Sequence, residues 1–263
     1  MTRIHPTARR LLVPADSDSN TGEVQLPAES PTQSILIVVA HPDDEILGAG
    51  GIAGVLADQG HKVTACILSG AVTARSHRPE GHELLDDTSS AASMLGMQTP
   101  ILGDFPNIKL NTVPHLDLVQ FVEAAIVTTG ATQVFTLHPG DLNDDHRQVS
   151  AACQAAVRLP LRRDGLPRLA GLHFMEVLSS TEWAFPGSGP SFRPNSFFEL
   201  SEANLDRKLA ALARYRGVMR PIPHPRSVEV VRGLAAVRGS QAGMIYAEAF
   251  QSAFADLAYL RNG

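Results

Sequence analysis

Two short stretches of this 263-residue chain gather histidines and carboxylates. The first is "AHPDDE" at residues 40–45, and the second is "HPGDLNDDHR" at residues 138–147. Three adjacent acids repel one another and lose hydration when they are buried, so they need a positive partner. Imidazole nitrogens and carboxylate oxygens are also ligands that Zn²⁺ takes in proteins. The two stretches together therefore predict a metal site.

Both stretches follow apolar runs that are typical of buried parallel strands, "ILIVVA" at 35–40 and "QVFTLH" at 133–138. Ligands bind at the carboxyl ends of such strands. His41 precedes a proline and keeps an extended backbone, and Asp44 at the start of the next helix can turn back toward the same point. A second histidine from the other stretch would complete a His/Asp/His set with open positions for water and substrate, as in catalytic zinc sites.

The first stretch is also compatible with two roles that need no metal. Its acids could form a helix cap and first turn, where carboxylates complement the helix dipole, but this leaves a third acid and His41 without a role. The segment "GAGGIA" at 48–53 fits the G-x-G-x-x-A dinucleotide fingerprint, yet seven residues separate it from the strand. We expect these glycines to lie inside a helix and to allow close packing.

Strand-like and helical segments alternate along the chain. Besides the two runs above, further strands are predicted at 62–69, 100–102, 173–178 and 197–200, and helices at about 44–58, 82–95, 115–128 and 147–158, with three more helices at the C-terminal end. This order predicts an α/β fold, a Rossmann-like three-layer sandwich with a mostly parallel central sheet and a C-terminal α+β extension packed on it. Residues 1–33 are predicted to be a flexible lead-in, which leaves 34–263 as a single domain.

The composition narrows the classes of function. A net charge of −5, a pI near 6.0 and the lack of a dense basic stripe argue against a nucleic-acid partner. The N-terminal segment has no apolar core of a signal peptide and no run approaches the length of a membrane span, so we expect no membrane partner and a cytoplasmic location. Cys66 and Cys153 show no metal or disulfide spacing and are expected to be reduced core residues.

The ordered pair "AHPDDEILGAGG" and "HPGDLNDDHR" resembles the PIG-L/LmbE-like family of metal-dependent N-deacetylases, and the similarity extends over most of residues 35–258. The resemblance implies a small-molecule N-acetylated substrate, usually an amino sugar or a sugar-bearing metabolite, and a Zn²⁺ ion or another divalent metal. Carried over by position, it implies that His41, Asp44 and His146 are the metal ligands and that Asp43 is the general base. It also suggests a homo-oligomer.

The chain departs from the family pattern at Asn143. Many members read H-x-D-H at the second motif, whereas this chain reads "NDDH". An asparagine can donate a hydrogen bond to the oxyanion but cannot deliver a proton. The general acid is therefore open between Asp43, once it is protonated, and His224 in "PHPRS".

Several other residues are candidates for supporting roles. Arg75, Trp183 and Arg226 are candidate substrate contacts, although Trp183 could equally be a core anchor. Glu45 is expected to orient the site or support the helix start, and His138 could either support the site or only pack. Of the two acids Asp141 and Asp145, each of which could orient a ligand histidine or cap a loop, we favour only Asp141 for the orienting role.

Two rival functions use the same ligand set. Two histidines and one carboxylate also form the facial triad of iron(II) oxygenases, but an extra base at Asp43 and the α/β pattern count against that class. A non-catalytic metal-binding relative is a further alternative because of Asn143, and the presence of Asp43 argues against it.

Overall fold

The central sheet is built around a strand of mostly β-branched residues. β1 (Ser34–Val39) is buried along its whole length except at its first residue. In the computed structural model, which describes residues 32–70 and 81–256, seven strands form one sheet in the order β3-β2-β1-β4-β5-β7-β6. The other strands are β2 (Lys62–Ile67), β3 (Ile101–Leu102), β4 (Gln133–Leu137), β5 (Gly171–Met175), β6 (Ser196–Leu200) and β7 (Tyr246–Ala255).

Five of these strands run in the same direction. β1 pairs in parallel with β2 and β4, β2 with β3, and β4 with β5, whereas β7 is antiparallel to β5 and to β6. In the register of the two central strands, Val38 lies beside Thr136. The chain therefore leaves the sheet at adjacent points after β1 and β4, where the two polar stretches begin. The expected mostly parallel α/β sheet is confirmed.

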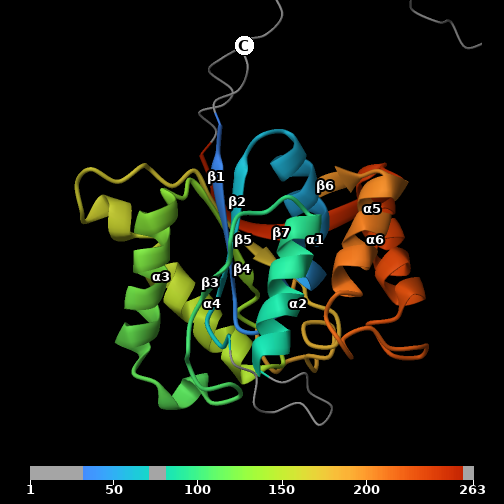
Figure 1. Cartoon of the computed structure of the whole chain (residues 1–263), viewed down its shortest axis with the longest axis horizontal. Helices are drawn as coiled ribbons and strands as arrows, with labels where there is room; N and C mark the ends of the chain where they lie inside the picture. Colours follow the sequence, from blue (N-terminus) through green and yellow to red (C-terminus); the bar gives the residue numbers. More distant parts are fainter. Residues whose placement is uncertain (1–31, 71–80, 257–263) are drawn as a thin grey trace, which may run out of the picture. The chain divides into compact units, whose positions relative to one another are not determined.

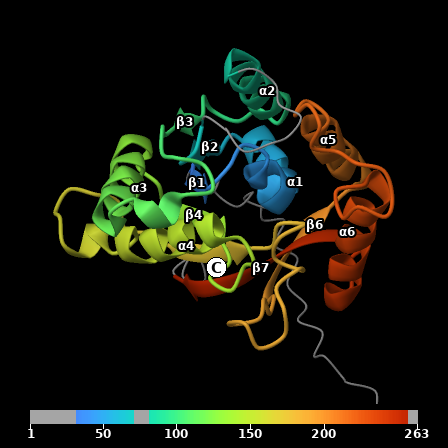
Figure 2. The same cartoon turned by 90° about the horizontal axis from the view of Figure 1, so that it is seen from below.

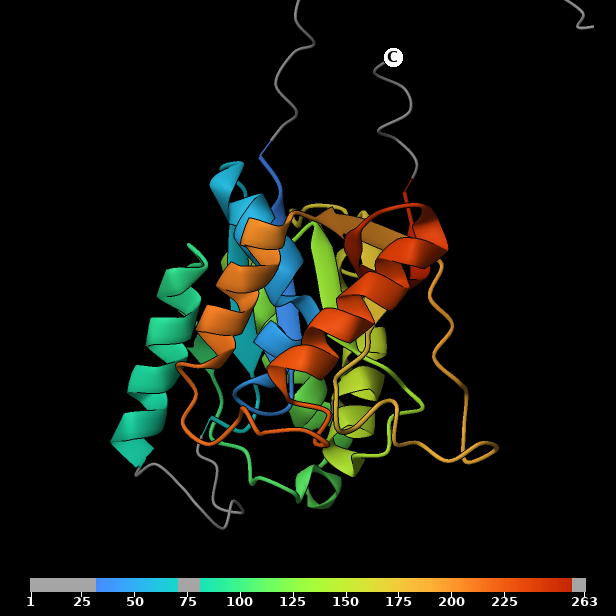
Figure 3. The same ribbon diagram turned by 90° about the vertical axis from the view of Figure 1, so that its right-hand side faces the viewer.

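Helices cover both faces of the sheet and make three layers (Figures 1 and 2). The helices are α1 (Asp44–Asp58), α2 (Gly81–Met94), α3 (His115–Thr129), α4 (Asp144–Ala156), α5 (Glu202–Leu212) and α6 (Val228–Ala242). α3 and α4 lie together on one face, and α1, α2, α5 and α6 lie on the other. Figure 3 shows α5 and α6 side by side in front of the sheet. Short 3₁₀ turns lie at Leu110–Thr112 and Leu159–Leu161.

The glycines near the start of α1 let the helix approach the sheet closely. A Cβ atom on Gly48 would lie 2.5 Å from Sδ of Met175, and one on Gly51 would lie 2.6 Å from a methyl group of Leu200. Both distances are too short for van der Waals contact. The expectation that these glycines serve packing inside a helix is confirmed.

A buried ion pair braces an irregularity in α1. The backbone leaves helical geometry at Ala49, with φ −143° and ψ 17°. On one side of this break, Lys208 Nζ donates to the carbonyl oxygen of Leu47 at 2.8 Å. On the other side, the Glu248 carboxylate accepts from the backbone N–H groups of Gly51 at 2.8 Å and Ile52 at 2.7 Å. Lys208 and Glu248 contact each other at 2.7 Å, so a single pair satisfies backbone groups on both sides of the break.

The C-terminal part differs from the expectation in one element. Three helices were expected there, but in the described residues only α5 and α6 follow β6, and the alanine-rich segment after α6 is β7. Alanine favours helices, yet this segment lies between β5 and β6 and supplies the ladder hydrogen bonds that both strands need. Tertiary pairing has overridden local propensity. The helix expected at 147–158 also begins earlier, at Asp144, because Asn143 caps it.

The two cysteines belong to the core, as expected. Both thiols are free and buried, and burial raises the pKa of each. Of the helices in the described residues, none has the length and apolar character needed to cross a membrane.

Candidate metal centre

Three side chains from the two polar stretches converge at the carboxyl edge of the sheet. His41 follows β1, Asp44 is the first residue of α1, and His146 lies in the first turn of α4. His41 Nδ1 lies 3.3 Å from Asp44 Oδ2, and His146 Nε2 lies 3.2 Å from the same oxygen. One ligand atom from each residue falls within 4.8 Å of the others, and all three residues are buried. Two imidazole nitrogens and a carboxylate oxygen fit a divalent cation such as Zn²⁺.

His41 is held by a carboxylate on the far side of its ring. Its Nε2 contacts Asp145 Oδ2 at 3.0 Å, which leaves Nδ1 for the metal position. Asp145 is fixed in turn by the backbone N–H groups of Ile108 at 2.7 Å and Leu110 at 3.0 Å. Burial raises the pKa of Asp145, but the hydrogen bond with His41 and those from Leu110 and Ile108 outweigh it, and the net shift is downward. Asp145 thus contacts the ring of a candidate ligand histidine, a position in which the sequence had favoured only Asp141.

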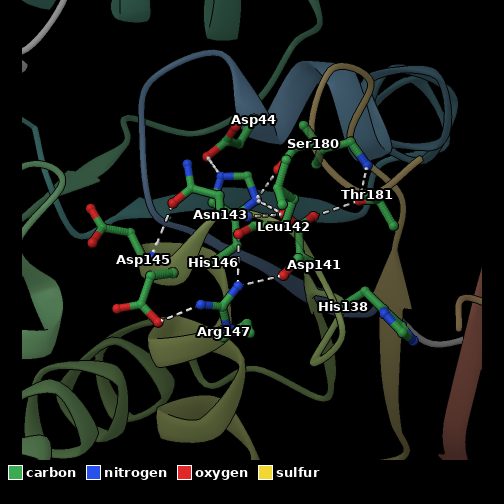
Figure 4. A network of polar contacts seen from close by, with 12 residues as sticks. Asp44, His138, Asp141, Leu142, Asn143, Asp145, His146, Arg147, Ser180 and Thr181 are labelled. Atoms are coloured by element: carbon green, nitrogen blue, oxygen red, sulfur yellow. Dashed lines mark hydrogen bonds and ion pairs between the residues drawn. The ribbon is translucent and has the colours of Figure 1, made fainter. Parts of the chain in front are cut away.

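His146 has a corresponding support. Its Nδ1 lies 3.3 Å from Asp141 Oδ1 and 3.3 Å from the hydroxyl of Ser180. That hydroxyl donates to Asp141, and the Thr181 hydroxyl donates to the other Asp141 oxygen at 2.6 Å. Figure 4 shows this chain of contacts from the loop after β5 to the ring of His146. Carboxylates behind ligand histidines fix the ring orientation and the tautomer.

The electrostatics of the centre favour positive charge. Burial lowers the pKa of His146, but the carboxylates of Asp44 and Asp141 outweigh it and raise the pKa to about 10. The pKa of Asp44 is pushed upward by burial and, more strongly, downward by the two histidines, so it lies well below its usual range. The carboxylates therefore create a negative potential at the point between the three ligand atoms, which suits a cation.

Asp43 lies beside the three ligands but is held by a different partner. Its carboxylate accepts from Arg226 Nη1 at 2.9 Å, and Arg226 Nε donates to the Ser179 hydroxyl at 2.7 Å. The Asp43 backbone has φ 108°, a strained value for a residue other than glycine. Strain of this kind is typical of residues whose side-chain position matters for function.

Glu45 supports the strained backbone of Asp43. Its carboxylate accepts the Asp43 N–H at 3.0 Å and a hydrogen bond from the Tyr215 hydroxyl. Burial raises the pKa of Glu45 to about 8. The three acids of the first stretch thus occupy three environments: Asp44 faces the histidines, Asp43 faces an arginine, and Glu45 faces a tyrosine.

Asn143 caps α4 and thereby fixes its own amide. Its side-chain oxygen accepts from the Asp145 backbone N–H at 3.0 Å, as Figure 4 shows. Because the side-chain oxygen points to the start of α4, the NH₂ group of the same amide points away from the helix start. Asn143 also lines the cavity that contains the metal ligands. The side chain can therefore offer a hydrogen-bond donor to a bound molecule.

The segment with His224 forms a neighbouring wall. His224 Nδ1 accepts from the Arg226 backbone N–H at 3.0 Å, and its ring lies edge-on to Trp183 with the centroids 6.0 Å apart. Trp183 is 47% exposed and is therefore not a core anchor. Both Trp183 and Arg226 line the metal cavity.

One predicted site residue, His138, lies away from the metal centre. The buried ring of His138 packs edge-on against Phe174 and Phe192, and its Nδ1 accepts the Gly140 N–H at 3.1 Å. Figure 4 shows it pointing away from His146, so it shapes the turn rather than the metal centre. Arg75 lies outside the described residues.

The centre opens into a cavity of about 460 Å³. Its lining comes from the loops after β1, β3, β4 and β5 and from the segment before α6. A cavity of this size holds a small organic molecule. Loops from five parts of the chain thus surround one set of metal ligands, an arrangement suited to binding a substrate next to a cation.

Comparison with known proteins finds a matching family and a similar curated protein. Residues 36–157 match the family described as PIG-L, GlcNAc-PI de-N-acetylase. Over 189 residues, which make up 70% of this chain and 91% of the relative, the chain is 25% identical to an uncharacterised deacetylase of Escherichia coli K12, YaiS. The resemblance on the two histidine-containing motifs is confirmed.

Solved structures share the fold and differ in reaction. N,N'-diacetylchitobiose deacetylase from Pyrococcus horikoshii is 19% identical with a TM-score of 0.63, over 90% of this chain and 89% of that one. The 4-carboxy-2-hydroxymuconate hydratase GalB from Pseudomonas putida is 20% identical with a TM-score of 0.69, over 86% and 98%. At these identities the likeness shows the fold alone, so the reaction has to be argued from the site.

Proposed function

We propose that the chain, whose residues 36–157 match the PIG-L family of de-N-acetylases, is a zinc-dependent hydrolase. Its reaction would remove the N-acetyl group from an amino sugar or a sugar-bearing metabolite. The observation that supports the proposal is the position of Asp43, which lines the same cavity as His41, Asp44 and His146 and binds Arg226. A cytoplasmic location and a homo-oligomeric state stay predictions.

The proposed reaction needs a base, an oxyanion donor and an acid. A divalent cation at His41, Asp44 and His146 would supply positive charge that polarises the amide carbonyl and acidifies water. Asp43 takes a proton from the attacking water while the water oxygen bonds to the amide carbon. The Asn143 NH₂ group donates a hydrogen bond to the developing oxyanion. The C–N bond then breaks, the amine nitrogen takes up the proton, and the products are acetate and the free amine.

Asp43 is the better candidate for returning that proton to the amine. Burial and the nearby charges of Arg226 and Arg220 lower the pKa of His224. Near neutral pH its imidazole is therefore neutral and a poor proton donor. A carboxylic acid formed at Asp43 in the first step can pass the same proton on.

The alternatives can be separated by what the protein releases. An iron(II) oxygenase would need dioxygen and a keto-acid, and that class is built on all-β barrels, whereas this sheet is mostly parallel with helices on both faces. A hydratase of the same fold would add water without releasing acetate. A non-catalytic relative would bind metal and release nothing.

The test is acetate release with defined metal content. Purified protein is stripped with a chelator, reloaded with one equivalent of Zn²⁺, and incubated with N,N'-diacetylchitobiose and methyl N-acetylglucosaminide. We expect acetate only from the reloaded protein, with Asp43→Asn as a metal-loaded control. Full activity of the metal-free protein, or no acetate from any acetylated amino sugar, would contradict the proposal.

A further inference from the structure

Three large apolar side chains surround the opening of the metal cavity. Ile108 is 57% exposed, Leu142 43% and Trp183 47%, and all three line the cavity. They come from different loops, after β3, β4 and β5. Single exposed apolar residues are common on protein surfaces, but three that share one cavity form a surface for binding. We refer to Ile108, Leu142 and Trp183 as the apolar rim.

Ile108 is displayed at a cost in backbone strain. Its φ is 58°, a left-handed value that β-branched residues rarely adopt. Folding gains little from this side chain because it is more than half exposed. The backbone N–H of Ile108 is bound by Asp145, which also holds His41, so the loop is fixed relative to the metal ligands. A strained, exposed apolar residue held by the same carboxylate as a candidate metal ligand supports a role in contact with a ligand.

The charged side chains among the described lining residues of the cavity are already paired, so they offer little to an anionic group. Apart from the ligand histidines, Arg226 is the cation among the described lining residues, and Asp43 already binds it at 2.9 Å. Asp144 is also paired, with Arg147 at 2.7 Å. A phosphate or nucleotide attached to the sugar would meet paired charges and three apolar side chains in this part of the chain. A neutral apolar group would bury against the rim favourably, because no charge has to be desolvated.

We infer that the substrate is an N-acetylated amino sugar linked to a neutral apolar aglycone, and that the apolar rim binds this aglycone. The inference rests on the proposed function and makes Ile108 a specificity-determining residue. The acetamido group lies at the metal ligands and the aglycone extends outward between the three loops.

The inference can be tested with glycosides that differ only in the aglycone. The probes are methyl and hexyl N-acetylglucosaminide, with uridine-diphosphate N-acetylglucosamine as the anionic comparison. Acetate release gives kcat/KM for each probe. Binding is measured separately by fluorescence of Trp183, the one tryptophan of the chain, which lines the cavity. We expect the hexyl probe to exceed the methyl probe about tenfold in both measurements, which corresponds to burial of roughly two methylene groups.

Ile108→Gly removes the side chain without straining the backbone. Glycine adopts φ 58° freely, so this variant should keep or raise the melting temperature and keep its metal. It should reduce the hexyl preference to less than about threefold. Leu142→Ala should reduce it as well. Ile245→Ala is the matched control, because Ile245 is 77% exposed but does not line the cavity, and it should leave the preference unchanged.

The outcomes separate this inference from the proposed function. Equal kcat/KM and equal affinity for the methyl and hexyl probes would overturn the apolar-aglycone inference and leave deacetylation standing. A preference for the uridine-diphosphate probe, or a hexyl preference that survives both Ile108→Gly and Leu142→Ala, would overturn it too. If no probe releases acetate, the proposed function fails, and the fluorescence titration still tests the apolar rim. Tighter binding of the hexyl probe that is lost in Ile108→Gly supports the rim. Equal binding of both probes, or no binding, refutes it.

Discussion

At the scale of single residues, two neighbouring residues at the start of α4, Asn143 and Asp145, have different contacts. Asn143 caps the helix with its oxygen and keeps its NH₂ group for the cavity, while Asp145 fixes the ring of His41. The two residues are linked, since the backbone N–H that Asn143 accepts belongs to Asp145. The helix cap and the residue that holds His41 therefore lie in the same turn. A variant of Asn143 has to distinguish the loss of the cap from the loss of the proposed catalytic amide.

Replacing Asn143 by alanine and by serine distinguishes helix capping from the amide hydrogen-bond donor. Serine is also a good helix cap, so Asn143→Ser should keep the stability that Asn143→Ala loses, about 1 kcal/mol. Both variants lack the amide donor, and both should lose roughly 10²–10³ in kcat at unchanged metal content. Thermal unfolding, metal analysis and acetate-release kinetics provide the three readouts. Normal turnover in Asn143→Ser would show that the amide has no catalytic role.

His173 should make the stability of the protein depend on pH. Burial lowers its pKa to about 4, and its ring stacks on Phe135 at 4.7 Å. The unfolded chain has a histidine pKa of about 6.5, so between about pH 6.5 and 4 it binds more protons than the folded protein. Stability should therefore be lost as the pH falls through this window, by up to about 3 kcal/mol.

The check is denaturant unfolding at several pH values for the wild type and for His173→Gln. The variant should have a flatter profile below pH 6.5, whereas His115→Gln, at an exposed position, should follow the wild type. Parallel profiles for all three proteins would remove His173 as the cause.

The sequence was enough to predict which residues form the candidate metal site, but not which residues support them. Histidine and aspartate beside strand ends were enough to propose His41, Asp44 and His146, and the structure brings these three together. The support from Asp145 was missed because its partners, the backbone of Ile108 and Leu110, come from a loop whose position no local pattern specifies. The adjacency of Asp145 to a ligand histidine was the one signal available.

At the scale of elements, the break in α1 depends on the Lys208–Glu248 pair. Glu248→Ala would leave the Lys208 ammonium buried without its partner and would free two backbone N–H groups. We expect a loss of about 3–5 kcal/mol in the free energy of unfolding. The double variant Lys208→Met/Glu248→Leu should lose less than Glu248→Ala because no charge stays buried. Denaturant unfolding of the three proteins tests this, and a change below about 1 kcal/mol in Glu248→Ala would refute the bracing role.

Elements were predictable where the pattern and the tertiary context agree. β1 and β4 lie in the centre of the sheet, and both were predicted from their runs of consecutive apolar residues. β7 was not predicted, since three helices were expected at the C-terminal end, and its state is set by pairing with β5 and β6. Such pairing joins residues far apart in the chain and leaves no local trace.

At the scale of the whole molecule, the parallel sheet explains how distant residues meet. His41 and His146 are separated by more than a hundred residues, yet they follow adjacent strands and their rings lie with centroids 5.4 Å apart. The order of motifs predicted the fold because parallel strands end at one edge. The cavity walls could not be predicted, since the loops after β3 and β5 carry no regular pattern. Trp183 and Arg226 were candidates from the sequence, whereas Ile108 and Leu142 were recognised only from the structure.

The division of roles between Asp43 and Asp44 is the most direct test of the proposed mechanism. The measurement is zinc content by mass spectrometry together with acetate-release kinetics for Asp43→Asn and Asp44→Asn. Asp44→Asn should lose metal affinity and, with it, activity, because its carboxylate is the one that contacts both histidines. Asp43→Asn should retain a full equivalent of zinc and lose roughly 10²–10⁴ in turnover, the usual contribution of a general base. Loss of zinc from Asp43→Asn, or full zinc occupancy and activity in Asp44→Asn, would contradict this division of roles.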